Sequence, residues 1–317
     1  MSGLSMGRRA LLSGAAAATL AAPAVLAQGE RVLRVGYQKY GTLVLLKGRG
    51  ALEQRLRGEG VRVAWTEFPA GPALLEALNV GAIDFGTVGE APPVFAQAAG
   101  APLLYVAHEP PAPRGEAILV GRDSPVRGVP ELRGKKVAFN KGSNVHYLLA
   151  RALEAAGLRY ADIEPATLPP ADARVAFERR QVDAWAIWDP FLAAAEAATG
   201  ARQLADGTGL VSNHQFYVAS ERFAGANGAL VDAVVAALAE TAAWVGQDIP
   251  AAARALSPGV GIPAPILEVA MRRQAYGVRP LDAAVAAEQQ RIADTFHGLG
   301  LIPRAIRVSD AVRQTGA

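Results

Sequence analysis

Apolar residues in the first third of the chain follow two different periods, which predict short strands separated by helices. Residues 31–37 alternate in a strand pattern, and residues 61–65, 82–86 and 103–107 form further short apolar runs. Helical spacing of the apolar residues lies between these runs, at about 43–56 and 72–80. Because strands that alternate with helices form mainly parallel sheets, this part of the chain predicts one α/β unit.

A second unit of the same kind follows a proline-rich segment at 109–114. Strands are predicted at 117–120, 136–139 and 182–187, with helices at about 144–156 and 171–180. The proline-rich segment is a stiff connection between the units. A strand at 216–219 carries the chain back, and residues from about 230 onward are helical with apolar faces.

These patterns together predict an α/β fold of two similar lobes joined by a hinge that the chain crosses twice. Residues 31–110 form the first part of lobe I, residues 115–213 form lobe II, and residues 216–317 return to lobe I and end in helices. Two crossings imply a hinged cleft. Ligands of such sheets bind beyond the carboxyl ends of the strands.

An internal repeat supports two similar lobes. Residues 75–86 and 174–185 are offset by 99 positions. Each stretch ends a helix, turns, and enters a short apolar strand whose second residue is Asp84 or Asp183. The alternative is a chance likeness, because all helix-turn-strand units look alike.

The first 27 residues are predicted to be a signal peptide. Arg8 and Arg9 precede an alanine-rich apolar run from Ala10 to Leu26, and the small Ala27 fits a signal-peptidase site. We therefore expect a periplasmic protein. The arginine pair resembles a twin-arginine signal, although the match is loose. A single membrane anchor is the alternative, but Gly14 and Pro23 interrupt a run that is already short.

Charge and cysteine content exclude several functions. Removal of the predicted signal leaves 30 basic residues against 29 acidic ones, so no nucleic-acid partner is implied. The chain has no cysteine, which excludes thiol catalysis, disulfides and cysteine metal sites. The four histidines have no metal-ligand spacing. We expect no cofactor, no metal and no enzymatic activity, and we expect a monomer.

Three loops bring polar residues to predicted helix starts: Thr87 to Glu90, Gly142 to Asn144, and Asp189 with Pro190. Free backbone N–H groups and the helix dipole bind anions at such ends. The alternative is that Ser143 and Asp189 only cap their own helices.

An ordered set of motifs across nearly the whole mature chain resembles the aliphatic sulfonate-binding proteins of bacterial ABC transporters. The motifs are Gly36–Lys39, Phe68–Pro72, Leu75–Gly81, Gly89–Pro93, Phe95–Gly100, Lys141–Ser143 and Val182–Pro190. The resemblance implies a type II periplasmic binding protein that closes on an alkanesulfonate and presents it to a permease and its ATPase.

The resemblance also implies a ligand-binding set. A sulfonate is a permanent anion with three acceptor oxygens, so it needs N–H and hydroxyl donors but no proton transfer. Trp188 would form an apolar wall for the alkyl tail. The expected ligand-binding residues are Gln38, Thr87, Gly89, Glu90, Gly142, Ser143, Asn144, His146, Trp188 and Asp189.

Several of these residues have a structural alternative. Gln38 could instead cap the next helix, Trp188 could lie in the core, and His146 could be solvated. Lys39 and Lys141 are excluded because loop lysines are usually solvated.

Two departures from the family pattern and several rival ligands remain open. The family often has a small residue where this chain has Tyr40, and a second serine where it has Asn144, and both changes alter the tail pocket that the resemblance implies. Similar proteins bind taurine, nitrate, bicarbonate or thiamine-precursor pyrimidines, and Glu90 or Glu109 could serve the ammonium group of taurine. The fold also hosts an aryl sulfinate desulfinase, which needs a cysteine that this chain lacks.

Overall fold

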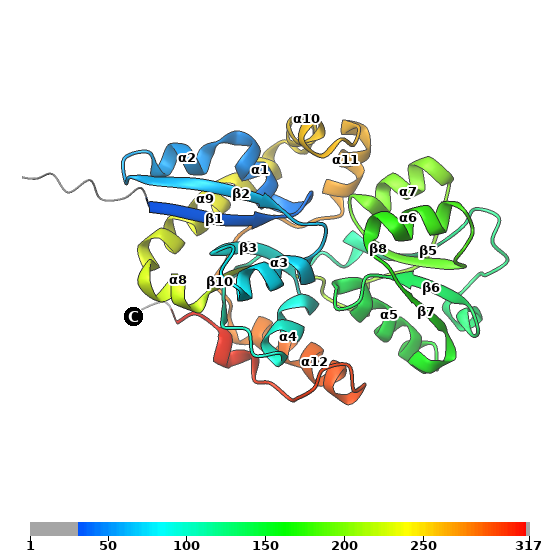
Figure 1. Ribbon diagram of the computed structural model, residues 1–317. Coiled ribbons are helices and arrows are strands. Elements are labelled where there is room, and N and C mark those ends of the chain that lie inside the picture. The colour runs from blue at the N-terminus through cyan, green and yellow to red at the C-terminus, as the bar shows by residue number, and fades with distance from the viewer. Residues whose placement is uncertain (1–30, 315–317) are drawn as a thin grey trace, which may run out of the picture.

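Two five-stranded sheets form the centres of two lobes in the computed structural model, which describes residues 31–314. Lobe I is the larger, blue-to-cyan and yellow-to-red part of Figure 1, and lobe II is the green part. The predicted signal peptide at 1–27 lies outside the described residues.

Lobe I is built from the two ends of the chain. Its first part contains β1 (Arg31–Tyr37), α1 (Gly41–Arg49), α2 (Ala51–Leu56), β2 (Val61–Glu67), α3 (Gly71–Asn79), β3 (Phe85–Gly89), α4 (Ala91–Ala98) and β4 (Leu103–His108). Its second part contains β10 (Gln215–Ser220), α8 (Glu221–Ala226), α9 (Gly228–Gln247), α10 (Ile249–Val260), α11 (Ala264–Arg272) and α12 (Ala283–Gly298).

Lobe II is built from the middle of the chain. It contains β5 (Glu116–Val120), β6 (Lys136–Phe139), α5 (Asn144–Ala155), β7 (Glu164–Thr167), α6 (Pro170–Glu178), β8 (Ala184–Trp188), α7 (Phe191–Thr199) and β9 (Arg202–Asp206).

The two sheets have the same topology. Their strand orders are β2-β1-β3-β10-β4 and β7-β6-β8-β5-β9. In each sheet one strand, β10 or β5, runs antiparallel to both of its neighbours, and the other four are parallel to one another. Each antiparallel strand is the first one the chain enters after a crossing. The prediction of mainly parallel sheets is therefore correct.

The predicted repeat is present, with the same offset of 99 residues. α3 and α6 begin and end 99 residues apart, and so do β3 and β8. Both aspartates lie one residue before their strand, however, instead of at its second position. The Asp84 carboxylate accepts the backbone N–H of Arg34 at 3.0 Å, and the Asp183 carboxylate accepts that of Lys136 at 2.8 Å. Asp84 thus joins the start of β3 to β1, and Asp183 joins the start of β8 to β6.

The two crossings between the lobes are hydrogen-bonded to each other. Glu109 N donates to Gln215 O at 2.8 Å, Ala112 N donates to Ser212 O at 3.0 Å, and Gly207 N donates to Pro113 O at 2.9 Å. A side chain at Gly207 would place its Cβ 2.6 Å from the Pro113 carbonyl oxygen, so this close approach requires glycine. The crossings therefore form one ribbon between the lobes.

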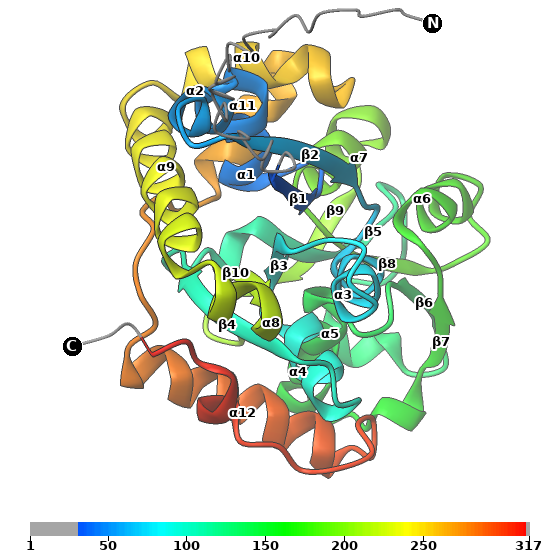
Figure 2. The same cartoon turned by 60° about the vertical axis from the view of Figure 1, so that its left-hand side comes forward.

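The C-terminal helices cover lobe I. α9 crosses its back, and its buried residues Val231, Val234 and Leu238 pack in the same core cluster as Leu33 of β1. Figure 2 shows α9 along one side of this lobe and α12 below it. α9 is long and apolar enough to cross a membrane by length and composition. Its burial against β1 and α1 identifies it as a core helix instead.

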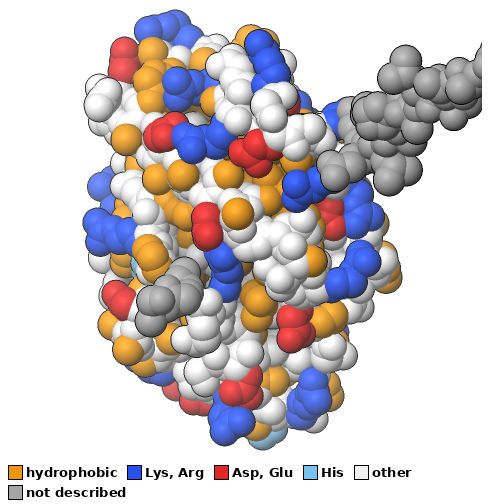
Figure 3. Space-filling view, turned by 90° about the vertical axis from the view of Figure 1, so that its left-hand side faces the viewer, with side chains coloured by type: hydrophobic (Ala, Val, Ile, Leu, Met, Phe, Trp, Pro, Cys, Tyr) orange, Lys and Arg blue, Asp and Glu red, His pale blue; other side chains and the backbone are white. Residues whose placement is uncertain are grey.

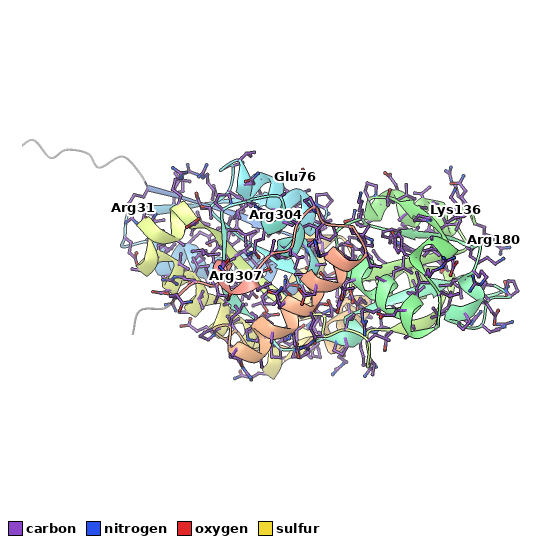
Figure 4. All side chains as sticks on the ribbon, turned by 90° about the horizontal axis from the view of Figure 1, so that it is seen from below. Arg31, Glu76, Lys136, Arg180, Arg304 and Arg307 are labelled. Carbon is purple, nitrogen blue, oxygen red and sulfur yellow. The ribbon has the colours of Figure 1, made fainter. Side chains whose placement is uncertain are left out.

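Charged side chains lie mainly on the outside. On the face of lobe I turned to the viewer in Figure 3, lysine and arginine side chains are interspersed with acidic ones. In Figure 4, Arg31 lies at one end of the molecule and Arg180 at the other, well away from the junction of the lobes.

Candidate functional site

A narrow pocket lies between the lobes. It is lined by the ends of strands, by helix starts and by both crossings: Gln38, Tyr40, Gly71, Gly89, Pro92, Gly115, Ser143, Asn144, Trp188, Asp189, Asn213, Gln215 and Gln274.

Six of the ten expected site residues line this pocket, namely Gln38, Gly89, Ser143, Asn144, Trp188 and Asp189. The other four, Thr87, Glu90, Gly142 and His146, do not line it. Thr87, Glu90 and His146 are buried directly behind the lining residues.

Lobe I contributes two buried glutamines held by one strand. Gln38 follows β1, and its Nε2 donates to the carbonyl oxygen of Thr87 at 3.0 Å. Gln215 of β10 donates from Nε2 to Thr87 Oγ1 at 2.5 Å and to Val88 O at 2.8 Å. Gln38 therefore does not cap helix α1, which has Tyr40 as its N-cap residue and no side-chain cap. Thr87 fixes both amides from behind.

Lobe II contributes the start of α5. Ser143 is its N-cap residue, but the hydroxyl donates to Asn140 O at 2.7 Å and does not cap the helix. Gly142, which adopts a φ of 76°, makes the turn into the helix. The interpretation of Ser143 as a plain cap is therefore wrong, and the first turn of α5 keeps backbone N–H groups without a side-chain cap.

Asn144 connects the lobes. Its Nδ2 donates to Asn213 Oδ1 at 2.6 Å, and its Oδ1 accepts the backbone N–H of Ala91 at 3.3 Å. Ala91 begins α4 in lobe I, and Asn213 belongs to the second crossing. A Cβ on Gly89 would lie 2.1 Å from the Asn144 amide, so glycine allows this close contact.

His146 is a core residue and not a solvated one. Its ring is fully buried and stacks with Phe139 at 4.9 Å and Phe95 at 6.0 Å between centroids. Its Nδ1 accepts the N–H of Gly142 at 3.2 Å. Burial lowers the His146 pKa to about 4, so the ring is neutral at physiological pH. The neutral ring supports the turn that precedes α5.

Asp189 is the one carboxylate among the residues that line the pocket. Its Oδ1 accepts the Ala193 N–H at 3.0 Å and lies 3.5 Å from Arg273 Nη1, while Oδ2 is buried without a partner. Burial raises the Asp189 pKa to about 7, and the nearby Arg273 opposes this shift. The expected helix-start geometry is slightly different, because Pro190 is the N-cap residue and α7 begins at Phe191.

Glu90 faces away from the pocket. Its Oε2 accepts the His214 N–H at 3.0 Å, and burial raises its pKa to about 8. Glu109, the other glutamate considered for an ammonium ligand, binds the hydroxyls of Thr42 and Tyr217. Neither glutamate lines the pocket.

Trp188 ends β8 and is 8% exposed, with its exposed part in the pocket wall. It therefore belongs both to the core of lobe II and to the site. Its ring meets Phe191 edge-on at 6.2 Å between centroids. The pocket thus combines an aromatic surface with amide and hydroxyl groups.

Among the described residues that line the pocket there is no lysine or arginine. Lys39 instead pairs with Glu67 at 3.4 Å. An anion here would be held by neutral donors and helix N–H groups. Proton transfer is not needed for such binding.

Several lining residues were not predicted. Gln274 comes from the segment after α11, and Asn213 and Gln215 come from the second crossing and the start of β10. No motif or periodicity marks these glutamine and asparagine residues. Gly71 and Pro92 lie inside the Phe68–Pro72 and Gly89–Pro93 motifs, which do not by themselves distinguish pocket residues from structural ones.

Comparison with known proteins gives consistent relatives. Residues 56–252 match the family described as "NMT1/THI5 like". An Escherichia coli (strain K12) protein described as an aliphatic sulfonates-binding protein is 46% identical over 284 residues, which are 89% of this chain and 88% of that protein.

Two solved structures are similar over nearly their whole length. The alkanesulfonate-binding protein SsuA from Xanthomonas axonopodis pv. citri, bound to MOPS, has 45% identity and a TM-score of 0.86, covering 90% of this chain and 98% of that one. The periplasmic aliphatic sulphonate binding protein SsuA from Escherichia coli has 45% identity and a TM-score of 0.82, covering 90% and 93%. These likenesses confirm the predicted two-lobed α/β fold.

Proposed function

The chain belongs to the NMT1/THI5-like family and to the aliphatic sulfonate-binding proteins, and from this premise we propose that it binds an alkanesulfonate between its lobes and delivers it to an ABC permease and its ATPase. The similar proteins are binding proteins, so the chain is a transport component and not an enzyme. Their periplasmic location supports the same location here.

The observation that carries the proposal is a pocket whose polar donors come from both lobes. Gln38, which has a second amide hydrogen beyond the one given to Thr87, lies on lobe I, whereas Asn144 and the other N–H groups at the start of α5 lie on lobe II. A ligand that binds both sets stabilises the closed arrangement, because each lobe alone offers only part of the donors. Closure then presents a distinct surface to the permease.

Each direct contact has a proposed role. The second amide hydrogen of Asn144 and the N–H groups at the start of α5 hold sulfonate oxygens. Ser143, whose hydroxyl donates to Asn140 O, holds the turn that leads into this helix. Gln38 adds an amide from the other lobe. Gly89 allows the close approach of Asn144, and Trp188 packs against the first carbons of the tail.

The buried residues act indirectly in this proposal. Thr87 positions the two glutamine amides. Gly142 and His146 set the entry to α5, and Glu90 fixes the second crossing through His214. Asp189 contacts the ligand on the side away from the sulfonate.

One observation favours a second ligand class, the aminosulfonates such as taurine. Asp189 Oδ2 is buried at the pocket without a hydrogen-bond partner. A ligand ammonium group would supply both a donor and the opposite charge. Asp189, and not Glu90 or Glu109, is therefore the candidate partner of an ammonium group.

Calorimetric titration of the ligand-free protein, without residues 1–27, tests the function directly. Ethanesulfonate, butanesulfonate, taurine, sulfate and nitrate are titrated in parallel. Binding of the alkanesulfonates with silence from the inorganic anions supports the proposal. Binding of taurine alone would favour the aminosulfonate class, and binding of nitrate alone would contradict both.

A further inference from the structure

We propose that Arg273 is a closure latch, a positioning residue that strengthens the binding of every ligand by the same factor without contacting any of them. A closure latch is here an ion pair between the lobes that forms only when they lie together. The inference rests on the proposed function in one respect, because it assumes that the lobes close on a ligand.

The guanidinium of Arg273 reaches from lobe I to two carboxylates of lobe II. Arg273 directly follows α11, and its Nη2 donates to Glu196 Oε2 of α7 at 2.6 Å. Its Nη1 lies 3.5 Å from Asp189 Oδ1, just after β8. Both ion pairs recorded for Arg273 thus join it to the other lobe, and separation of the lobes breaks them.

Both ends of the latch are anchored within their own lobes. Glu196 Oε1 accepts the side-chain amide of Gln203 in β9 at 2.7 Å, which leaves Oε2 for Arg273. The backbone N–H of Arg273 donates to Ala270 O at 3.1 Å and so continues the last turn of α11. Because these groups are already positioned, less side-chain freedom is lost when the pair forms.

The latch is shielded from solvent by the junction of the lobes. Only 14% of the Arg273 side chain is accessible, against 24% for Glu196 and 2% for Asp189. α11 packs against α7 there, and Figure 1 shows the two helices facing each other across the upper part of the junction. Salt screens such a partly buried pair less than it screens an exposed one.

The neighbouring arginine provides a comparison within the same helix. Arg272 donates to Glu268 at 2.6 Å, and both residues belong to α11. The side chain of Arg272 is 57% accessible. This pair lies within lobe I and is unaffected by the position of lobe II, so it gains nothing from closure.

The latch acts on the equilibrium between open and closed lobes. Neither Arg273 nor Glu196 lines the inter-lobe pocket. Because a ligand that bridges the lobes needs the closed arrangement, its apparent Kd rises as the closed fraction of the protein falls. Removing the pair therefore weakens every ligand by one common factor. We expect about fivefold, which corresponds to about 1 kcal/mol, the upper end of the range for surface ion pairs.

Calorimetry with ethanesulfonate and butanesulfonate tests the latch through a double-mutant cycle of Arg273→Ala and Glu196→Ala. Arg273 also lies beside Asp189, which lines the pocket, so Glu196→Ala is the variant that reports closure alone. The cycle cancels the effect that Arg273→Ala has at Asp189. Arg272→Ala and Glu268→Ala form the matched control cycle.

The distance between the lobes gives a second measurement that needs no ligand. Because the chain has no cysteine, Val80→Cys after α3 and Val175→Cys on α6 place one spin label on each lobe. Both positions are exposed. Pulsed electron paramagnetic resonance then measures the share of ligand-free protein with closed lobes. Glu196→Ala should lower this share, and Glu268→Ala should leave it unchanged.

The proposal expects Glu196→Ala to weaken both sulfonates about fivefold, with a coupling of about threefold or more to Arg273→Ala and none in the control cycle. An unchanged Kd in Glu196→Ala, single losses that multiply in full, or unequal losses for the two sulfonates overturn the latch and leave the proposed function intact. If Arg273→Ala does not fold, Glu196→Ala and the lobe distances decide.

Failure of the proposed function gives a different result. If no sulfonate binds the wild-type chain, that function is wrong, and the lobe distances alone decide the latch. Equal closed shares in the wild type, Glu196→Ala and Glu268→Ala then overturn it. A smaller closed share in Glu196→Ala alone supports the latch whatever the ligand is.

Discussion

Asp189 and Glu90 occupy equivalent positions in the two lobes, 99 residues apart, each directly after the last residue of a repeated buried strand. Both carboxyls are at most 2% exposed, and both have one oxygen without a partner. Only Asp189 lines the inter-lobe pocket, because Glu90 turns toward His214. The same position of the repeat therefore places Asp189 in the pocket and Glu90 in a buried hydrogen bond with His214.

Sulfonate affinity is expected to fall as the pH rises through about 7. Burial raises the Asp189 pKa to about 7, so the carboxyl is neutral below that pH and repels an anion above it. We expect alkanesulfonate binding to weaken about tenfold between pH 5.5 and 8.5. Taurine should show the opposite trend, because its ammonium group favours ionised Asp189. Titration calorimetry at both pH values measures this dependence.

Asp189→Asn tests the assignment of this pH dependence. Asparagine keeps an oxygen that accepts the Ala193 N–H but cannot ionise, so the pH dependence should disappear. Glu196→Gln is the control, since Glu196 also pairs with Arg273 but does not line the pocket. Burial raises the Glu109 pKa to about 7 as well. A pH dependence that persists in Asp189→Asn would therefore assign it to another group such as Glu109.

Trp188→Ala should weaken alkanesulfonate binding without unfolding lobe II. The substitution removes the aromatic surface at the pocket and leaves a partly exposed space. The expected loss for butanesulfonate is about tenfold in Kd, or about 1.4 kcal/mol. Trp65→Ala on β2, away from the pocket, is the control. Unchanged affinity in Trp188→Ala, with circular dichroism like that of the wild type, would show that the tail does not contact this ring.

The predictable parts of the fold are those whose side chains alternate regularly. β1 has the bounds expected from its alternating pattern, and the repeat located β3 and β8 to within three residues. β7 and β9 were missed because they are the two edges of the second sheet, where polar residues and Pro165 conceal a strand pattern. The helix expected at 43–56 is divided at Gly50, which adopts a φ of 61°.

The predictable parts of the site are those next to strand ends and helix starts. Gln38, Ser143 and Trp188 follow that rule and line the pocket. Gln274 lies in the loop after α11, and Asn213 lies in the second crossing. Both line the pocket only because the folded chain packs these segments beside it.

Gly89→Ala should weaken ligand binding by displacing Asn144. The new Cβ would lie 2.1 Å from the Asn144 amide, which can move only by losing its bonds to Asn213 and Ala91. We expect about a tenfold weaker Kd for butanesulfonate, similar to that of Asn144→Ala. The double variant should be no weaker than Asn144→Ala alone, because both changes remove the same contact.

Calorimetry on the four proteins of this cycle provides the test. Gly48→Ala is the control, since a Cβ on that helical glycine meets no atom within 4 Å. Additive losses in the double variant would mean that Gly89 and Asn144 act independently, contrary to the contact between them.

Glu116 is expected to make the protein less stable as the pH rises. The side chain is fully buried in β5, and neither carboxyl oxygen has a partner. Burial and the nearby Glu90 raise the Glu116 pKa well above its ordinary value. The folded protein therefore holds a proton that the unfolded chain releases above about pH 4.5, and the free energy of unfolding falls with increasing pH until the folded pKa is reached.

Glu116→Gln removes this proton linkage and should raise the free energy of unfolding at pH 8 by about 1 kcal/mol or more, since one pKa unit corresponds to about 1.4 kcal/mol. At pH 4.5 the advantage should fall to about 0.4 kcal/mol, because Glu116 is then protonated in the folded protein and about half protonated in the unfolded chain. Urea unfolding at the two pH values measures the difference, and Glu164→Gln on the exposed edge strand β7 is the control. A variant less stable than the wild type at pH 8 would show that the buried carboxylate is ionised and stabilised by its surroundings.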